Sequence, residues 1–190
     1  MILAYQGIWP DVHETAFVAS SADVIGHVHV GALSSIWFQC VVRGDVHKIH
    51  IGQRTNIQDQ SVLHVTRDEW ALTVGNGVTV GHRVLLHGCT IHDSVLVGMG
   101  SIIMDGAVIA ENSIVGAGSL VTEGKIFPPR SLIYGSPARL IRALDDKECT
   151  RIRQSAIHYV ADAKKYYGFV PGAKRHNDDQ YEFSDDQDSE

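Results

Sequence analysis

The sequence predicts an all-β solenoid, a parallel β-helix of hexapeptide repeats with a C-terminal α-helix packed alongside. Three observations lead to this prediction. An aliphatic residue recurs every six positions across residues 18–125, and a small or β-branched residue stands four positions after almost every one of them. A helical spacing follows only after residue 144. A strict period of six fits neither the 3.6-residue turn of a helix nor the two-residue alternation of a strand, whereas it is typical of short strands wound into stacked coils.

The repeat domain, residues 18–125, lies between an N-terminal segment, residues 1–17, and a connector, residues 126–144. Its period survives two phase slips and one short insertion, and Gly often follows the aliphatic position, where it relieves tight turns. About seventeen units are counted. The aliphatic residues expected to face inward are Val18, Val24, Val30, Ile36, Val42, Ile51, Ile57, Leu63, Val74, Val80, Leu86, Ile91, Val97, Ile103, Ile109, Val115 and Val121.

Residues 145–168 are predicted to form the C-terminal helix. Asp145 and Glu148 have the three-residue spacing of a capping box at its start. Five residues fall on one stripe at helical spacing and should pack along a face of the β-helix: Ile152, Ala156, Tyr159, Ala163 and Tyr166. The remaining residues, 169–190, are acidic and poor in apolar side chains, so we expect a disordered tail.

Charge and composition narrow the functional classes. The net charge of −6 arises from the last fourteen residues, which carry seven acids and no Lys or Arg, so nothing elsewhere favours a nucleic-acid partner. No stretch approaches about 18 apolar residues and the start lacks a secretion signal, so we expect no membrane span and a cytoplasmic protein. Cys40, Cys89 and Cys149 form no CxxC pair, which fits a reducing compartment, and Cys40 falls at an inward position.

The stretch GHRVLLHGCTIHD, residues 81–93, holds three histidines whose roles depend on the coil geometry. General chirality rules favour right-handed crossovers, yet this hexad resembles that of the left-handed β-helix family, which is triangular in section with three hexads per coil. In that geometry, units three apart in the count stack directly above one another. One such column is formed inside by Val42, Leu63 and Leu86 and outside by Arg43, His64 and His87.

The column places His64 and His87 side by side on coils about 4.8 Å apart, close enough to share one metal ion. His82 lies on the preceding face, stacked over Asp59, and could complete the site of a neighbouring subunit around a three-fold axis. Three His ligands with an open fourth position are typical of catalytic zinc. The column argument assigns no such role to the other histidines, which we interpret as surface or packing residues: His13, His27, His29, His47, His50, His92, His158 and His176.

These motifs resemble a known family over about residues 8–168. VVRGDVHKIHIGQRTNIQDQSVLHVT, followed by VTVGHRVLLHGCTI and VGMGSIIMDGAVI, closely resembles the bacterial gamma-class carbonic anhydrase-like proteins, and GSPAR and SAIHYV extend the match. The resemblance implies a homotrimer that binds zinc between subunits through His64 and His87 of one chain and His82 of the next. The metal would lower the pKa of water to about 7, so that hydroxide converts carbon dioxide to bicarbonate.

The resemblance also implies roles for six further residues. Arg43 of RGD would pair with Asp59 near the subunit boundary and fix the register of the trimer. Gln58 would orient the nucleophile, while Asn56 and Asp45 match other polar residues of the site. Tyr159 matches a helix tyrosine that approaches it.

The sequence departs from well-characterised active members in two places. Val46 stands where they carry an acidic residue, and residues 66–73, TRDEWALT, replace their long acidic loop with only Asp68 and Glu69. Proton export limits fast carbonic anhydrases, so low activity is expected. Two alternatives stay open: a metal-binding trimer without this activity, and a CoA-dependent acyltransferase, the other common function of hexapeptide β-helices. Iron(II) or cobalt(II) could replace zinc, because ligand type alone discriminates poorly among them.

Overall fold

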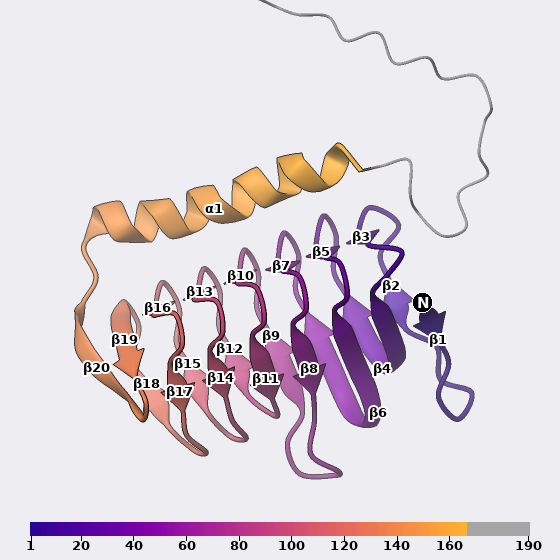
Figure 1. Cartoon of the computed structure of the whole chain (residues 1–190), viewed down its shortest axis with the longest axis horizontal. Helices are drawn as coiled ribbons and strands as arrows, with labels where there is room; N and C mark the ends of the chain where they lie inside the picture. Colours follow the sequence, from indigo (N-terminus) through magenta and orange to yellow (C-terminus); the bar gives the residue numbers. More distant parts are fainter. Residues whose placement is uncertain (167–190) are drawn as a thin grey trace, which may run out of the picture.

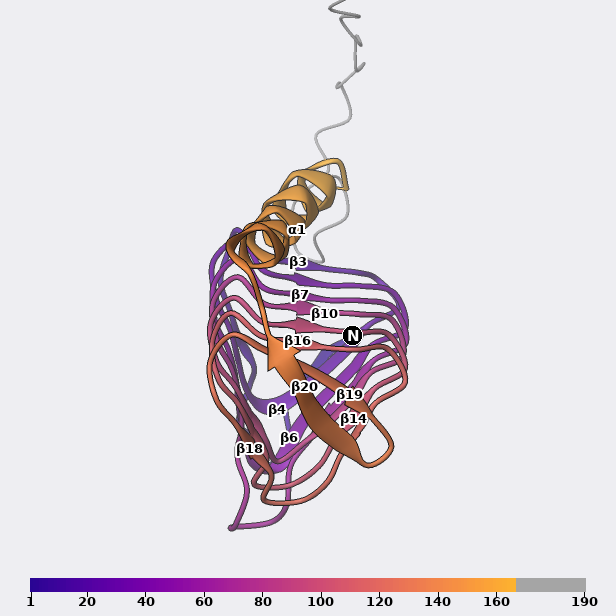
Figure 2. The ribbon, with the colours of Figure 1, turned by 90° about the vertical axis from the view of Figure 1, so that its left-hand side faces the viewer.

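The computed structural model describes residues 1–166, which form a solenoid of stacked three-sided coils with one helix alongside (Figure 1). The predicted left-handed parallel β-helix of hexapeptide repeats is confirmed. Seen end-on, the coils superpose closely, and the helix lies beside one side of the stack (Figure 2). Every strand pair of the described residues is parallel except β19 with β20.

Short strands line the three faces of the solenoid. The first face carries β1 (Ile2–Leu3), β8 (Val62–His64), β11 (Leu85–His87), β14 (Ile102–Ile103) and β17 (Leu120–Val121). The second carries β2 (Asp11–Val12), β9 (Leu72–Val74), β12 (Thr90–Ile91), β15 (Val108–Ile109) and β18 (Ile126–Phe127). Two longer strands turn the corner between these faces and belong to both: β4 (Asp23–Val30) and β6 (Val41–Ile51). The third carries β3 (Phe17–Val18), β5 (Ser35–Ile36), β7 (Asn56–Ile57), β10 (Thr79–Val80), β13 (Leu96–Val97), β16 (Ile114–Val115), β19 (Ser131–Gly135) and β20 (Ala138–Ala143).

The aliphatic residues of the repeat fill the interior of the coils. All seventeen predicted inward positions are buried, and Cys40 is buried with them. The backbone register confirms the predicted column, since Leu63 is the partner of both Val42 and Leu86. Burial of one aliphatic side chain in each unit, at about 25 cal/mol per Å² of apolar surface, is therefore the main force that stacks the coils.

The phase slips change which residue fills the second inward position of a unit. Val46 and Thr90 stand at the small or β-branched position four residues after Val42 and Leu86, but both are only partly buried. Ile49 and Cys89, each 1% exposed, take the inward positions instead. At the first slip, β6 contains three more residues than β4 between matched positions, so the chain bulges before it returns to register.

The solenoid extends at both ends beyond the predicted repeat. In the N-terminal segment, β1 and β2 pair with β4, and β3 pairs with β5. In the connector, β18 and β19 continue the stack before β20 turns back antiparallel. These strands give hydrogen-bond partners to the end coils, whose edges would otherwise be unpaired.

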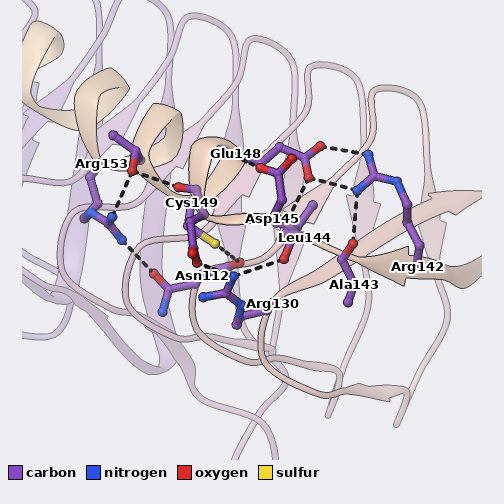
Figure 3. Close-up of polar contacts among 11 residues, drawn as sticks. Asn112, Arg130, Arg142, Ala143, Leu144, Asp145, Glu148, Cys149 and Arg153 are labelled. Atoms are coloured by element: carbon purple, nitrogen blue, oxygen red, sulfur yellow. Dashed lines mark hydrogen bonds and ion pairs between the residues drawn. The ribbon is translucent and has the colours of Figure 1, made fainter.

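The helix α1 (Asp146–Lys164) begins at the predicted capping box, with Asp145 as its N-cap. The Asp145 carboxylate accepts from the Glu148 backbone at 2.8 Å, and the Glu148 carboxylate accepts from the Asp145 backbone at 3.0 Å. Arg142 of β20 donates to both Glu148 oxygens, and this contact lowers the pKa of Glu148 to about 2 (Figure 3). A further pair, Arg130–Asp146, ties the same turn to the solenoid.

The predicted stripe of α1 faces the solenoid and contacts β5, β7 and β10. Ile152, Ala156 and Ala163 are buried, and the ring of Tyr159 lies 5.6 Å from that of Trp37. Residues 167–168 of the predicted helix and the predicted acidic tail lie outside the described residues. No helix within residues 1–166 is long and apolar enough to cross a membrane.

Candidate metal centre

His64 and His87 form a convergent pair on the first face of the solenoid. They end β8 and β11 and are partners in the backbone register, as predicted. His64 Nδ1 lies 3.1 Å from His87 Nε2, and the two rings are tilted by 54°. The side chains are 19% and 32% exposed, so the pair is accessible while its surroundings restrict the ring positions.

A carboxylate holds the opposite nitrogen of each ring. Asp45 Oδ1 lies 3.0 Å from His64 Nε2, and Asp105 Oδ1 lies 2.6 Å from His87 Nδ1. When both rings are neutral and each donates to its carboxylate, the two nitrogens that face one another each carry a lone pair. Carboxylate–histidine pairs of this kind orient the imidazoles of metal sites.

Arg43 completes this group by pairing with Asp45. Burial alone would raise the pKa of the Asp45 carboxyl, but the hydrogen bonds of His64 and Arg43 outweigh it and hold that pKa below its usual range. The pairing of Arg43 with Asp59 that the resemblance implied does not form within one chain. Arg43 and Asp45 are two positions apart on β6 and so project together, whereas Asp59 is engaged by His82.

The geometry of the pair fits a divalent cation. Two ligands of a tetrahedral zinc with bonds of about 2.0–2.1 Å lie about 3.3–3.4 Å apart, and the facing nitrogens at 3.1 Å need only a slight adjustment. Within residues 1–166, however, no three His, Cys, Asp or Glu side chains gather as a metal site. One chain therefore offers two of the three predicted imidazoles together, as the column argument expected.

His82 lies on a different edge of the solenoid. It follows β10, its side chain is 47% exposed, and its Nδ1 lies 2.8 Å from Asp59 Oδ2, which confirms the predicted stacking over Asp59. A groove of about 500 Å³ beside it is lined by Trp37, Phe38, Asp59, His82, Tyr159, Asp162, Lys165 and Tyr166. His82 is thus presented at an open, aromatic surface.

Gln58 and Asn56 belong to the His82 edge as well. Gln58 is 5% exposed, and its amide nitrogen donates to Asn56 Oδ1 at 3.1 Å. Asn56 donates to Thr79 Oγ1 at 3.0 Å, and this hydroxyl lies 3.2 Å from Ser155 Oγ of α1. Tyr159 lines the groove; burial, followed by the charges of Asp59 and Asp162, raises the pKa of its phenol.

The predicted site residues therefore fall into two sets. We name Arg43, Asp45, His64 and His87 the paired-histidine set, and Asn56, Gln58, Asp59, His82 and Tyr159 the single-histidine set. No hydrogen bond or ion pair of the described residues joins one set to the other. Within residues 1–166, His82 does not gather with His64 and His87 at one site.

Sequence reasoning missed Asp105 and the column of a second histidine pair. Asp105 lies two positions after Ile103, which stacks on Leu86, whereas the histidine column used only the residue one position after, which is Met104 on this coil. His29 and His50 are also register partners, although the column argument had assigned neither to a column. Their rings stack in parallel at 4.8 Å with an interplanar angle of 6°, and His29 bonds Asp11 at 2.7 Å.

Comparison with known proteins independently supports the family that the sequence motifs resemble. The family model described as bacterial transferase hexapeptide (six repeats) matches residues 88–123. The chain is 48% identical to protein YrdA of Escherichia coli over 85% of this chain and 91% of that protein. It is 43% identical to a carbonic anhydrase of Geobacillus kaustophilus over 87% and 91%. It is 44% identical to the mitochondrial gamma carbonic anhydrase 1 of Arabidopsis thaliana over 79% of this chain, and the match spans only 56% of that relative.

The solved structures give the same fold. A hexapeptide transferase family protein from Anaplasma phagocytophilum superposes with a TM-score of 0.83 at 42% identity, covering 87% of this chain and 98% of that one. An N-acyltransferase from Bacillus cereus, AntD, reaches a TM-score of 0.57 at 17% identity over 82% and 89% of the two chains, a likeness of fold alone.

Proposed function

Since this chain belongs to the gamma-class carbonic anhydrase-like family of hexapeptide-repeat proteins, we propose that it catalyses the reversible hydration of carbon dioxide with a divalent metal at the interfaces of a homotrimer. The observation that carries the proposal is that the three candidate histidines lie on two different edges of the chain. His64 and His87 converge on one edge with lone pairs facing each other, while His82 stands on another edge of the same chain. Each metal would be held by the pair of one subunit and His82 of the next.

An apolar column beside the paired histidines supports the trimer. Val62, Leu85 and Ile102 are register partners on the first face and point outward, and Val62 and Ile102 are 39% and 40% exposed. Contiguous apolar side chains on a solenoid face favour burial against another chain, and a closed ring is the usual symmetric arrangement. In such a ring Arg43 of one subunit could also approach Asp59 of the next, as the family resemblance implies.

The three histidines would hold zinc, or iron(II) or cobalt(II). When bound, the metal supplies the Lewis acidity that lowers the pKa of water to about 7 and so provides a nucleophile at neutral pH. Gln58 would orient this nucleophile: its amide nitrogen is committed to Asn56, which leaves Oε1 to accept a hydrogen bond. The raised pKa of Tyr159 favours the protonated phenol, which would serve as a donor.

Proton export from the site is expected to be slow. Val46 replaces the acidic residue of efficient members, and the loop after β8 carries only Asp68 and Glu69. Both of these acids are exposed at the bend of the loop. We therefore propose a carbonic anhydrase of low turnover whose rate rises with added buffer, because a buffer can replace the missing proton acceptor.

Complementation between subunits tests the proposal. We expect His82→Ala and His87→Ala, each expressed alone, to lose metal and hydration activity. When the two variants are co-expressed in equal amounts, random trimers should regain about one quarter of the sites, because an intact pair then meets an intact His82 at some interfaces. Co-expression of His64→Ala with His87→Ala is the matched control and should regain none, since both changes lie in the same set. Recovery in the control, or none in the test pair, would contradict the shared site.

The naming of several relatives as transferases favours a second candidate, a CoA-dependent acyltransferase. It predicts that CoA raises the thermal stability of the protein. It also predicts that the protein contains no metal, whether it is purified aerobically or anaerobically. Metal near one per chain with hydration of carbon dioxide would exclude it. Full metal occupancy with no hydration under any metal or redox condition would instead indicate a metal-binding trimer of another function.

A further inference from the structure

We infer that Asp105 is the positioning residue of the metal ligand His87, and that the loop between β8 and β9, through Thr66 and Trp70, holds Asp105 in place. The inference rests on the proposed function and names a residue for which neither the sequence nor the family resemblance indicated a role. It is carried by two hydrogen bonds and by the space that two glycines leave open.

Both oxygens of Asp105 are engaged. Oδ1 accepts from His87 Nδ1 at 2.6 Å, and Oδ2 accepts from the Thr66 hydroxyl at 2.9 Å. The carboxylate is 22% exposed, so it is partly shielded from water. Two directed contacts on one short side chain fix both its rotation and the ring that it supports.

Two glycines make room for this arrangement. A Cβ on Gly88, which follows His87, would overlap Asp105 Oδ1 and lie 2.6 Å from the Cβ of Trp70. A Cβ on Gly106, which follows Asp105, would lie 3.0–3.2 Å from the Trp70 ring. Trp70 therefore packs against the backbone at Gly88 and Gly106, where no side chain intervenes. An antiparallel bridge between Thr66 and Trp70 joins the two ends of this loop.

Asp45 and Asp105, the carboxylates that bond His64 and His87, differ in the charge they can give to their histidines. Asp45 shares its charge with Arg43. Among residues 1–166, the Asp105 carboxylate bonds the neutral Thr66 hydroxyl and His87 and no other side chain. A carboxylate that is not neutralised by a cation raises the basicity of its histidine more, and loss of such a partner typically weakens metal binding by about 10- to 100-fold.

Asp105→Asn tests the inference, because it removes the charge and keeps the shape. Asp93→Asn is the matched control. Asp93 also lies two positions after an inward aliphatic residue, and a Cβ on Gly75 would overlap it, but it bonds the Asn76 backbone at 2.8 Å instead of a histidine. We expect Asp105→Asn to weaken Co²⁺ and Zn²⁺ binding by about 10- to 100-fold against a competing chelator and to change the visible spectrum of bound Co²⁺. Asp93→Asn should match the parent protein, and Thr66→Val should fall between them.

A second measurement needs no metal. In the metal-free trimer at alkaline pH, ¹⁵N NMR should find the His87 proton on Nδ1, and Asp105→Asn should shift this population toward the Nε2 tautomer. If the parent protein binds metal and Asp105→Asn equals Asp93→Asn in affinity, spectrum and tautomer, Asp105 is not a positioning residue while the proposed function stands. If the parent protein binds no metal, the proposed function fails and the inference fails with it.

Discussion

Two pairs of histidines stack in register on neighbouring coils of this solenoid, and they are arranged in different ways. His64 and His87 are tilted by 54°, with two nitrogens 3.1 Å apart and a carboxylate on each opposite nitrogen. His29 and His50 lie parallel at 4.8 Å, and Asp11, whose side chain is 80% exposed, bonds His29 alone. Both pairs are register partners on adjacent parallel strands, so register alone does not account for the difference.

The two pairs show that closeness of two histidine rings and convergence of their nitrogens have different causes. Parallel in-register strands bring any two outward side chains of a column within about 5 Å of each other. Two nitrogens converge on one point only where something turns each ring, and in the first pair Asp45 and Asp105 do so from opposite sides. On this solenoid, the histidine pair whose nitrogens converge is the one with a carboxylate on each ring.

The largest expected effect follows from loss of a histidine in each pair. His87→Ala should abolish metal binding, whereas His29→Ala should leave it near one metal per chain, because the stacked rings of the second pair do not converge. Metal analysis of the purified proteins, after dialysis against a weak chelator, measures both. Two metals per chain in the parent protein, or loss of metal in His29→Ala, would end the distinction between the pairs.

A backbone change beside the convergent pair sharpens the comparison with a smaller effect. Gly88 and Gly77 both have positive φ, +50° and +61°, so alanine at either place costs about 1–2 kcal/mol in the left-handed region. A Cβ at Gly77 meets only Ser94 Oγ at 4.0 Å, whereas at Gly88 it would overlap Asp105. We expect Gly88→Ala to cost about 1–3 kcal/mol more than Gly77→Ala and to weaken metal binding as well.

Urea unfolding of the metal-free proteins at one protein concentration measures the difference in stability, and chelator competition measures the difference in affinity. Equal losses in the two variants would mean that strain at positive φ accounts for everything and that Asp105 moves aside freely. A loss of affinity in Gly77→Ala would show that the measurement reports general weakening of the coils.

Much of this site could be predicted from the sequence because the repeat fixes the register. The period of six identified Leu63 and Leu86 as stacked neighbours, and the outward residues after them followed at once. The same argument placed His82 over Asp59. At the start of α1, Asp145 and Glu148 were recognisable because a capping box is a local signal that needs no tertiary information.

The sequence did not predict two features: a pair of residues that precede the inward positions, and the partner that a flexible side chain selects. His29 and His50 precede Val30 and Ile51, which are register partners, and residues on both sides of an inward residue point outward in a strand. The column argument used only the residue after. Arg43 had two carboxylates within plausible reach, and its choice of Asp45 is a rotamer that no periodicity encodes.

The smallest expected effect concerns His29 and His50, the pair with parallel rings, and the pH dependence of stability. Burial, then the charges of His29 and Lys48, lowers the pKa of His50 below its ordinary value of 6.5. As the pH falls, the unfolded chain therefore takes up this proton before the folded protein does. The contribution to stability is complete above pH 6.5 and is lost as the pH falls through the lower folded pKa.

Substitution of His50 by Gln should remove this part of the pH dependence, so that the parent protein and His50→Gln differ in slope between the folded pKa and 6.5 and run parallel above it. His29→Gln should remove only part of it, because burial, the first cause, remains. Urea unfolding at a series of pH values, with chelator present and one protein concentration throughout, gives the slopes. The convergent pair should not respond in this way to either change, because its rings are held by Asp45 and Asp105 rather than by each other. If His50→Gln kept the parent slope, neither burial nor the charges of His29 and Lys48 would perturb His50 measurably, and the two pairs would differ only in where their nitrogens point.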